Sequence, residues 1–168
     1  AMNAAGARLA REVADGFSTK DKPRWVIGSI GPGTKLPSLG QITYATLRDA
    51  YQAEAAGLIA GGADALLVET SQDLLQIKAA VLGAKAAITA SGVDVPVWAQ
   101  AAFETTGTML LGTEIGAALT ALEPLGIERV GLNCSTGPAE MSEHLRYLAK
   151  HSGIGLSCMP NAGLPVLT

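Results

Sequence analysis

The sequence has 168 residues, which is enough for one domain with a substantial hydrophobic core. Its hydrophobic content of 48% and charged content of 16% exclude an intrinsically disordered chain. A net charge of −3 and an aromatic content of 4% argue against a surface that binds nucleic acid or anionic membranes.

Two cysteines, Cys134 and Cys158, are too few for a disulfide framework, so we expect reduced thiols and a cytoplasmic protein. The first fifteen residues have a helical pattern and carry charges such as Arg8, Arg11 and Glu12. We therefore expect neither a signal peptide nor a transmembrane segment, and no membrane partner.

Helical and strand patterns alternate along the chain. An amphipathic helix is expected first, over residues 3–17, because small apolar residues recur there at helical spacing. Short apolar runs bounded by turn residues then predict five strands, at residues 25–30, 63–68, 95–100, 128–132 and 154–158. Helical patterns between them predict four helices, at residues 43–61, 74–90, 114–125 and 140–151. This alternation is typical of an α/β fold with a parallel sheet and right-handed crossovers.

Two architectures fit this alternation: an open doubly wound sheet, or an arc of a (β/α)8 barrel. A whole barrel takes about 250 residues, so this chain is long enough for only part of one. Both architectures place function at the carboxyl ends of the strands. The glycine pattern of a dinucleotide site is missing, and Pro32 in the first strand–helix turn would remove an amide donor from such a site.

Polar residues gather where the predicted strands end. They are Ser29, Glu69, Thr70, Gln100, Asn133, Cys134 and Asn161. A carboxylate, a thiol and several amides suit a small zwitterionic ligand. Glu69 suits an ammonium group, and Cys134 suits a nucleophile or a soft metal ligand. Structural roles compete with these interpretations: Glu69 also suits a helix N-terminus, and Asn133 suits a turn.

The remaining cysteine and the histidines point to structural roles. Cys158 lies in an apolar strand and is expected in the core. His144 and His151 are expected on a helix surface and at a helix end. No metal-binding spacing such as Cys-x-x-Cys or His-Glu-x-x-His occurs, so no local motif forms a complete metal site.

Four segments together resemble the homocysteine S-methyltransferase family, and most closely the homocysteine-binding domain of the cobalamin-dependent methionine synthases. They are WVIGSIGP at 25–32, GGADALLVET at 61–70, VGLNCSTGP at 130–138 and PNAGLP at 160–165. Their order and spacing match, and the resemblance covers nearly the whole chain.

The resemblance implies a partial (β/α)8 TIM-type barrel, with residues 1–168 as a single partial homocysteine-binding domain. It implies methyl transfer to the sulfur of homocysteine, which gives methionine. Zinc held by three cysteinates binds the substrate thiol in this family. By position in the motifs, Cys134 corresponds to the first zinc ligand and Glu69 to the residue that binds the amino group. Asn161 corresponds to an asparagine beside the metal, and Ser29 and Asn133 complete the expected substrate-binding set.

The sequence also departs from the family pattern. It lacks the early Asp-Gly-Gly/Ala-x-Gly-Thr turn, an Ile-Glu-Thr-Asn segment, and the Gly-Gly-Cys-Cys-Gly-Thr strand that supplies two zinc cysteines. The chain therefore corresponds to strands three to seven, with one zinc ligand of three, and we expect it to be inactive alone. No catalytic residue is assigned. Cobalamin, or a methyl donor domain or small-molecule donor, would belong to other parts of a longer protein.

Two alternatives remain open at this point. The first is a non-catalytic α/β scaffold or interaction module, because an incomplete barrel leaves open sheet edges that favour self-association. The second is another barrel enzyme, such as an aldolase or lyase. That chemistry needs a lysine at a strand end, and the lysines here lie in turns, in a loop or on helices.

Overall fold

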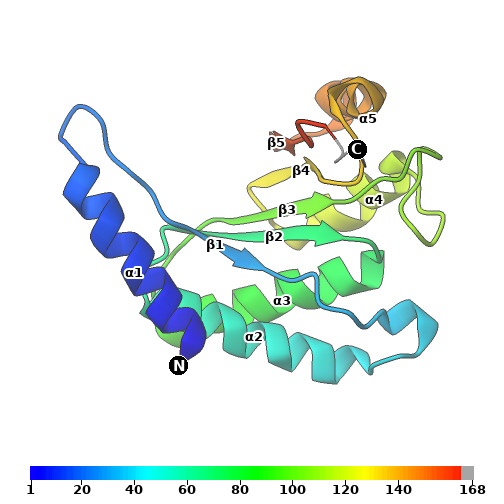
Figure 1. Ribbon diagram of the computed structural model, residues 1–168. Helices are drawn as coiled ribbons and strands as arrows, with labels where there is room; N and C mark the ends of the chain where they lie inside the picture. The colour runs from blue at the N-terminus through cyan, green and yellow to red at the C-terminus, as the bar shows by residue number, and fades with distance from the viewer. Residues whose placement is uncertain (164–168) are drawn as a thin grey trace, which may run out of the picture.

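A five-stranded parallel sheet forms the centre of the protein, as the computed structural model of residues 1–163 shows (Figure 1). Its strands are β1 (Ile27–Ile30), β2 (Ala65–Ser71), β3 (Val97–Ala101), β4 (Arg129–Asn133) and β5 (Gly155–Met159). They pair in sequence order, and every pair is parallel. The predicted α/β alternation with five parallel strands is confirmed.

The helices begin and end close to the predicted positions. They are α1 (Met2–Phe17), α2 (Tyr44–Ala60), α3 (Leu74–Ser91), α4 (Ile115–Leu122) and α5 (Pro138–His151). Thr43 caps α2 by accepting a bond from the Thr46 amide. The helix expected over residues 114–125 ends at Leu122 and continues as a short 3₁₀ turn. Pro124 explains the change, because proline has no amide hydrogen to continue an α-helix.

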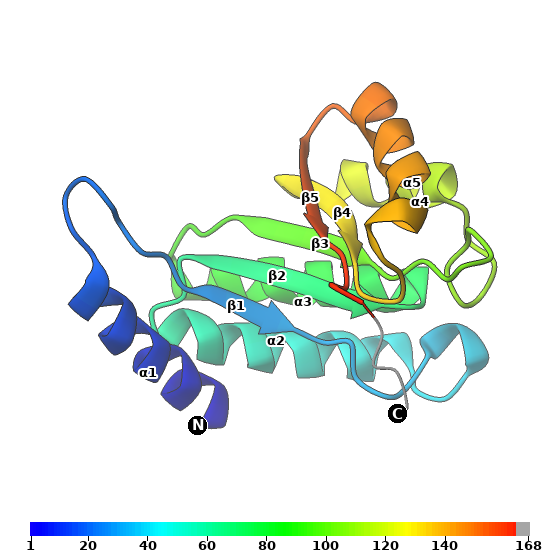
Figure 2. The same ribbon diagram turned by 45° about the horizontal axis from the view of Figure 1, so that its top comes forward.

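The sheet has the topology of a barrel arc. Each strand lies beside its successor, and α2 and α3 run side by side along one face (Figure 1). A doubly wound sheet would reverse its strand order and carry helices on both faces. Figure 2 shows β4 and β5 turned away from the direction of β1 to β3, so the sheet curves. The described residues form this open arc and do not close a barrel.

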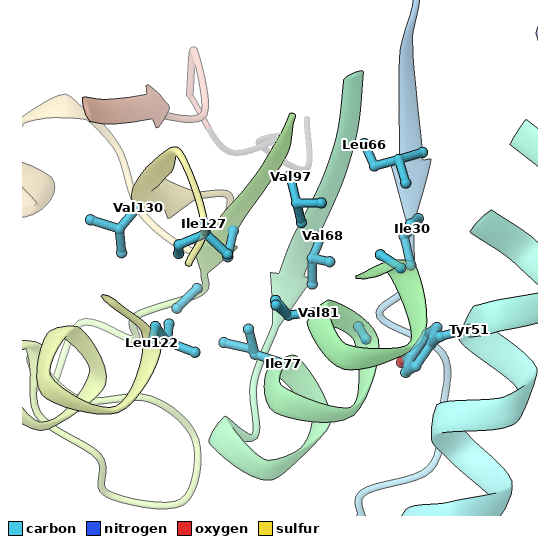
Figure 3. Packing of buried hydrophobic residues seen from close by; sticks show 14 of the residues in the cluster. Ile30, Tyr51, Leu66, Val68, Ile77, Val81, Val97, Leu122, Ile127 and Val130 are labelled. Carbon is cyan, nitrogen blue, oxygen red and sulfur yellow. The ribbon is translucent and has the colours of Figure 1, made fainter. Parts of the chain in front are cut away.

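The hydrophobic core lies between the helices and the sheet (Figure 3). Strand residues such as Val68 and Val97 meet Ile77 and Val81 of α3 there. The contact between α2 and α3 is close, because a Cβ atom at Gly83 would come within 2.6 Å of the Arg48 carbonyl oxygen. Among residues 1–163, α3 alone is long and apolar enough to cross a membrane, but it packs against both α2 and the sheet, with Ile77 and Val81 in the core, so it is a core helix.

A charged cluster fixes α1 to the amino ends of β1 and β2. Arg11 Nη1 lies 2.6 Å from Asp64 Oδ2, and the Val26 amide donates to the same oxygen at 2.6 Å. Arg11 Nη2 also donates to the Arg24 carbonyl at 2.9 Å. These bonds explain why β1 begins at residue 27 and not at the predicted residue 25. The segment before it binds the cluster, and Trp25 is 70% exposed.

Cys158 was expected in the core, and this prediction is wrong. The residue is exposed, with its Sγ 3.8 Å from Met141 Sδ of α5. The apolar pattern of its strand is real, but within residues 1–163 β5 pairs only with β4. An edge strand is covered less completely than a central one, so its side chains stay accessible.

His144 is half-buried on α5 and packs against Phe103, with ring centroids 4.9 Å apart. It is therefore less exposed than the sequence predicted. Burial lowers the pKa of His144 below its usual value, and Glu143 opposes this effect. A lowered folded-state pKa means that the unfolded chain binds the proton more tightly.

We expect this histidine to make stability depend on pH. The contribution of neutral His144 to the free energy of unfolding is present above about pH 6.5, the usual histidine pKa. It is lost as the pH falls through the lowered pKa of the folded state. Urea unfolding across this range should show the decline, and His144→Gln should remove it. The control His151→Gln, on the last residue of the same helix, should retain it. An unchanged pH dependence in His144→Gln would contradict the assignment.

Candidate functional site

The candidate site lies on the inner face, which is the sheet face turned away from α2 and α3. Strand β2 has a bulge there: Val68 pairs with Ala99 and Ser71 with Ala101, so two residues of β2 stand opposite Gln100. Those two residues are Glu69 and Thr70. Because side chains alternate along a strand and Val68 packs toward the helices, Glu69 faces the inner side.

Strands β1 and β4 orient the Glu69 carboxylate. Ser29 Oγ of β1 donates to Glu69 Oε1 at 2.5 Å, and Asn133 Nδ2 of β4 lies 3.3 Å from Oε2. Each carboxylate oxygen thus has a donor from another strand: Oε1 from the adjacent β1, and Oε2 from β4, which lies beyond β3 in the sheet. Glu69 is half-buried, so one side of this carboxylate stays accessible to a ligand.

The Asn133 amide joins the ends of β2 and β4. Its Oδ1 accepts from the Thr70 amide at 2.8 Å, and its Nδ2 donates to Thr70 Oγ1 at 2.7 Å. The same Nδ2 lies 3.4 Å from Cys134 Sγ. The side chain is only 2% exposed. One buried amide therefore connects the carboxylate, the hydroxyl and the thiol of the site.

The turn after β4 carries the thiol. Cys134 and Ser135 have φ of 54° and 55°, in the left-handed region. The Cys134 amide donates to the Met159 carbonyl of β5 at 3.2 Å. The Asn161 amide in turn donates to the Thr136 carbonyl at 3.2 Å. The segment after β5 therefore lies against the cysteine-bearing turn.

Four of the five predicted site residues are joined by side-chain contacts, and the fifth by a backbone contact. Ser29, Glu69, Asn133 and Cys134 form a continuous set of contacts across three strands. Asn161 joins this set through its backbone. Sequence reasoning gave Thr70 no role, although its backbone and hydroxyl both bind Asn133. Its place directly after an apolar strand was the one available signal, and its φ of 59° was not predictable from that signal.

The described residues do not form a zinc site by themselves. Within residues 1–163, no three His, Cys, Asp or Glu side chains converge as metal ligands. Cys134 offers one soft ligand on the inner face. Cys158 pairs with Leu132, which packs among the helices, so the second thiol lies on the opposite face. A single thiolate is too few ligands for tight zinc binding.

The loop between β1 and α2 is held against the start of α3. Asp73, 1% exposed, accepts from the Ser38 amide at 2.9 Å, from Ser38 Oγ at 2.7 Å and from the Leu75 amide at 2.8 Å. Tyr51 Oη donates to the Pro32 carbonyl at 2.6 Å. Burial, with a smaller contribution from the nearby Glu54 carboxylate, raises the pKa of Tyr51 to about 12, so its hydroxyl remains a donor at neutral pH.

Comparisons with known proteins show which proteins this chain is similar to. The chain is 64% identical over 162 residues to the methionine synthase of Mycobacterium tuberculosis (strain ATCC 25618 / H37Rv). It is 63% identical over 162 residues to that of Mycobacterium leprae (strain TN). Each match covers 96% of this chain, but only 14% and 13% of the respective relatives, so the chain spans a small part of their length.

Solved structures show the same fold at lower identity. The apo crystal structure of the homocysteine methyltransferase MmuM from Escherichia coli superposes with a TM-score of 0.73 at 21% identity, covering 93% of this chain and 56% of that one. The metallated form gives 0.67 at 22% identity, covering 93% and 55%. The family model for homocysteine S-methyltransferase matches residues 1–167. The chain therefore belongs to the homocysteine S-methyltransferase family.

Proposed function

We propose that this chain is the homocysteine-binding part of a zinc-dependent methionine synthase, with residues 1–168 belonging to one domain. The observation that carries the proposal is the set of contacts from Glu69 through Asn133 to Cys134. Homocysteine has an ammonium group at one end and a thiol at the other. The set offers a carboxylate for the first and a soft metal ligand for the second.

Each residue has a proposed role. Glu69 binds the substrate ammonium, with Ser29 and Asn133 beside it in the substrate-binding set. Cys134 is one zinc ligand, and Asn161 lies beside the metal. The remaining ligands come from other segments of a longer protein, in keeping with the small share of its relatives that this chain spans. The chemistry that zinc supplies in such a site is to hold a thiol as thiolate at neutral pH.

Other proposed features follow from the family. The methyl donor, either methylcobalamin carried by another domain or a small molecule, lies outside residues 1–168, and the compartment is the cytoplasm. The isolated chain is inactive, because its own residues supply one thiolate on the inner face. None of its lysines lies in a described strand, and family membership also disfavours a Schiff-base aldolase.

A non-catalytic role for the isolated chain has one observation in its favour. Exposed apolar side chains of α1 and of the segment before β1 line a groove of about 680 Å³. They include Leu9, Val13, Phe17 and Trp25. Together with the open edges of β1 and β5, this surface supports the proposal that the isolated chain self-associates. Light scattering that shows a monomer at all concentrations would contradict it.

A chimera tests the proposed function. The matched region of the Mycobacterium tuberculosis relative is replaced by this chain, and methionine formation and bound zinc are measured. We expect the chimera to be active and to contain zinc. Cys134→Ser should lower both at least tenfold, because one of few metal ligands is lost. Cys158→Ser is the matched control and should change neither. An active, zinc-containing Cys134→Ser chimera would refute the role of Cys134.

A further inference from the structure

Gln100 on β3 has a buried acceptor that the fold leaves unused. The residue is fully buried, and its Nε2 donates to Ser157 Oγ of β5 at 2.6 Å. Its Oε1 has no hydrogen-bond partner among residues 1–163. Buried amide oxygens are almost always paired, because leaving one unpaired is costly. An unpaired acceptor in a candidate site therefore indicates a missing donor.

The register of the sheet puts this acceptor beside the Glu69 carboxylate. The bulge in β2 sets Glu69 and Thr70 opposite Gln100. Gln100 follows Ala99, which packs toward the helices, so its side chain shares the inner face with Glu69. Gly131 and Ser157 continue the same row of paired residues across β4 and β5. Because Gly131 has no side chain, nothing from β4 stands between Gln100 and Ser157.

The chemistry of the row fits an ammonium group. An ammonium has three N–H donors and one positive charge. Glu69 supplies the opposite charge, but its oxygens already have donors in Ser29 and Asn133. A neutral amide oxygen next to that carboxylate adds an acceptor without a second negative charge. The bond from Nε2 to Ser157 directs the amide so that the oxygen is the free atom.

We propose that Gln100 is a specificity-determining residue whose Oε1 accepts a hydrogen bond from the α-ammonium of the amino-acid substrate. This inference rests on the proposed function, since it takes an aminothiol as the ligand of the inner face. It extends that function, because it assigns recognition of the amino group to a residue outside the set of Ser29, Glu69 and Asn133.

The test compares two ligands on the zinc-containing chimera described above, by isothermal titration calorimetry under reducing conditions. They are L-homocysteine and 4-sulfanylbutanoic acid, which is the same molecule without its amino group. Gln100→Leu keeps the side-chain volume and removes the acceptor. We expect it to weaken homocysteine binding about tenfold or more, the effect of losing a hydrogen bond to a charged group. Binding of the deaminated ligand should be unchanged, whereas a general loss of structure would weaken both.

Two further variants protect the test against a folding defect. Gln100→Glu retains acceptor oxygens and should keep homocysteine binding. Ser157→Ala frees the amide to rotate and should weaken homocysteine binding in the same selective way, by a smaller factor. Ser71→Ala is the control, because the buried Ser71 hydroxyl also has no partner within residues 1–163, but it packs beside Ala101, toward the helices. It should change neither affinity.

The outcomes separate the inference from the function beneath it. Two results with a homocysteine-binding wild type would overturn the specificity role and leave the proposed function intact. In the first, Gln100→Leu binds homocysteine as tightly as wild type. In the second, Gln100→Leu is folded but loses affinity for both ligands equally. If the wild-type chimera contains zinc but binds neither ligand, the proposed function of the inner face falls together with this inference.

Discussion

Replacing Gly131 with alanine is expected to detach β5 from the sheet. A Cβ atom at this position would lie 1.7 Å from the Ser157 carbonyl oxygen and 2.6 Å from its carbon, both in the backbone of the neighbouring strand. A backbone cannot turn away as a flexible side chain does, so the whole strand must move. We expect the free energy of unfolding to fall by about 3 kcal/mol or more, at the upper end of overpacking effects.

Urea unfolding measures this loss, and hydrogen exchange of the β5 amides locates it. The cysteine turn should loosen as well, because the Cys134 amide is bonded to the Met159 carbonyl. Gly6→Ala is the matched control. Apart from its own helix backbone, no atom of residues 1–163 lies within 4 Å of a Cβ at that position, so alanine should preserve or slightly raise stability. Equal stability of Gly131→Ala and wild type would contradict the close approach of β4 and β5.

Asp73→Ala is expected to release the loop between β1 and α2. The substitution removes the N-cap of α3 and leaves three donors without their acceptor, two of them from Ser38. Caps contribute about 1 kcal/mol, and hydrogen bonds to a charged group more, so we expect a loss of about 2–4 kcal/mol. Limited proteolysis should then cut within residues 31–42.

Ser38→Ala separates the two parts of this effect. It removes only the hydroxyl donor and keeps the backbone bond from the Ser38 amide to Asp73, so we expect a loss of about 1 kcal/mol. Protease resistance of the loop should remain close to that of wild type. A loop that stays uncut in Asp73→Ala would show that the contacts of Tyr51 and Gln76 with the Pro32 carbonyl are sufficient to hold it.

The sequence was sufficient to predict the topology of the sheet because the same strand-then-helix pattern repeats along the chain. Every predicted strand is an apolar run bounded by turn residues, and each of the four predicted helices after the first lies between two of them. That Glu69 and Cys134 lie in the same site was also predictable, since all strands of a parallel sheet end at the same edge. The four ordered motifs indicated the family, and the comparison with known proteins confirmed it.

The local geometry of the site was not predictable in the same way. The bulge at Glu69 and Thr70 depends on Asn133, which is 63 residues from Thr70 in the chain. No local pattern carries such a distant bond. The prediction that Cys158 is buried was wrong for a related reason. Its strand is apolar, but the neighbours that decide whether a side chain is buried come from tertiary packing and not from the strand itself.

The left-handed residues at the ends of β2 and β4 have a consequence for evolution. Thr70, Cys134 and Ser135 all adopt a conformation that glycine adopts at a lower steric cost. Thr70 nevertheless provides the hydroxyl of the site and Cys134 its thiol, and the Ser135 hydroxyl donates to the Glu104 carboxylate. Selection for a more relaxed backbone and selection for these functional groups therefore act in opposite directions at the same three codons.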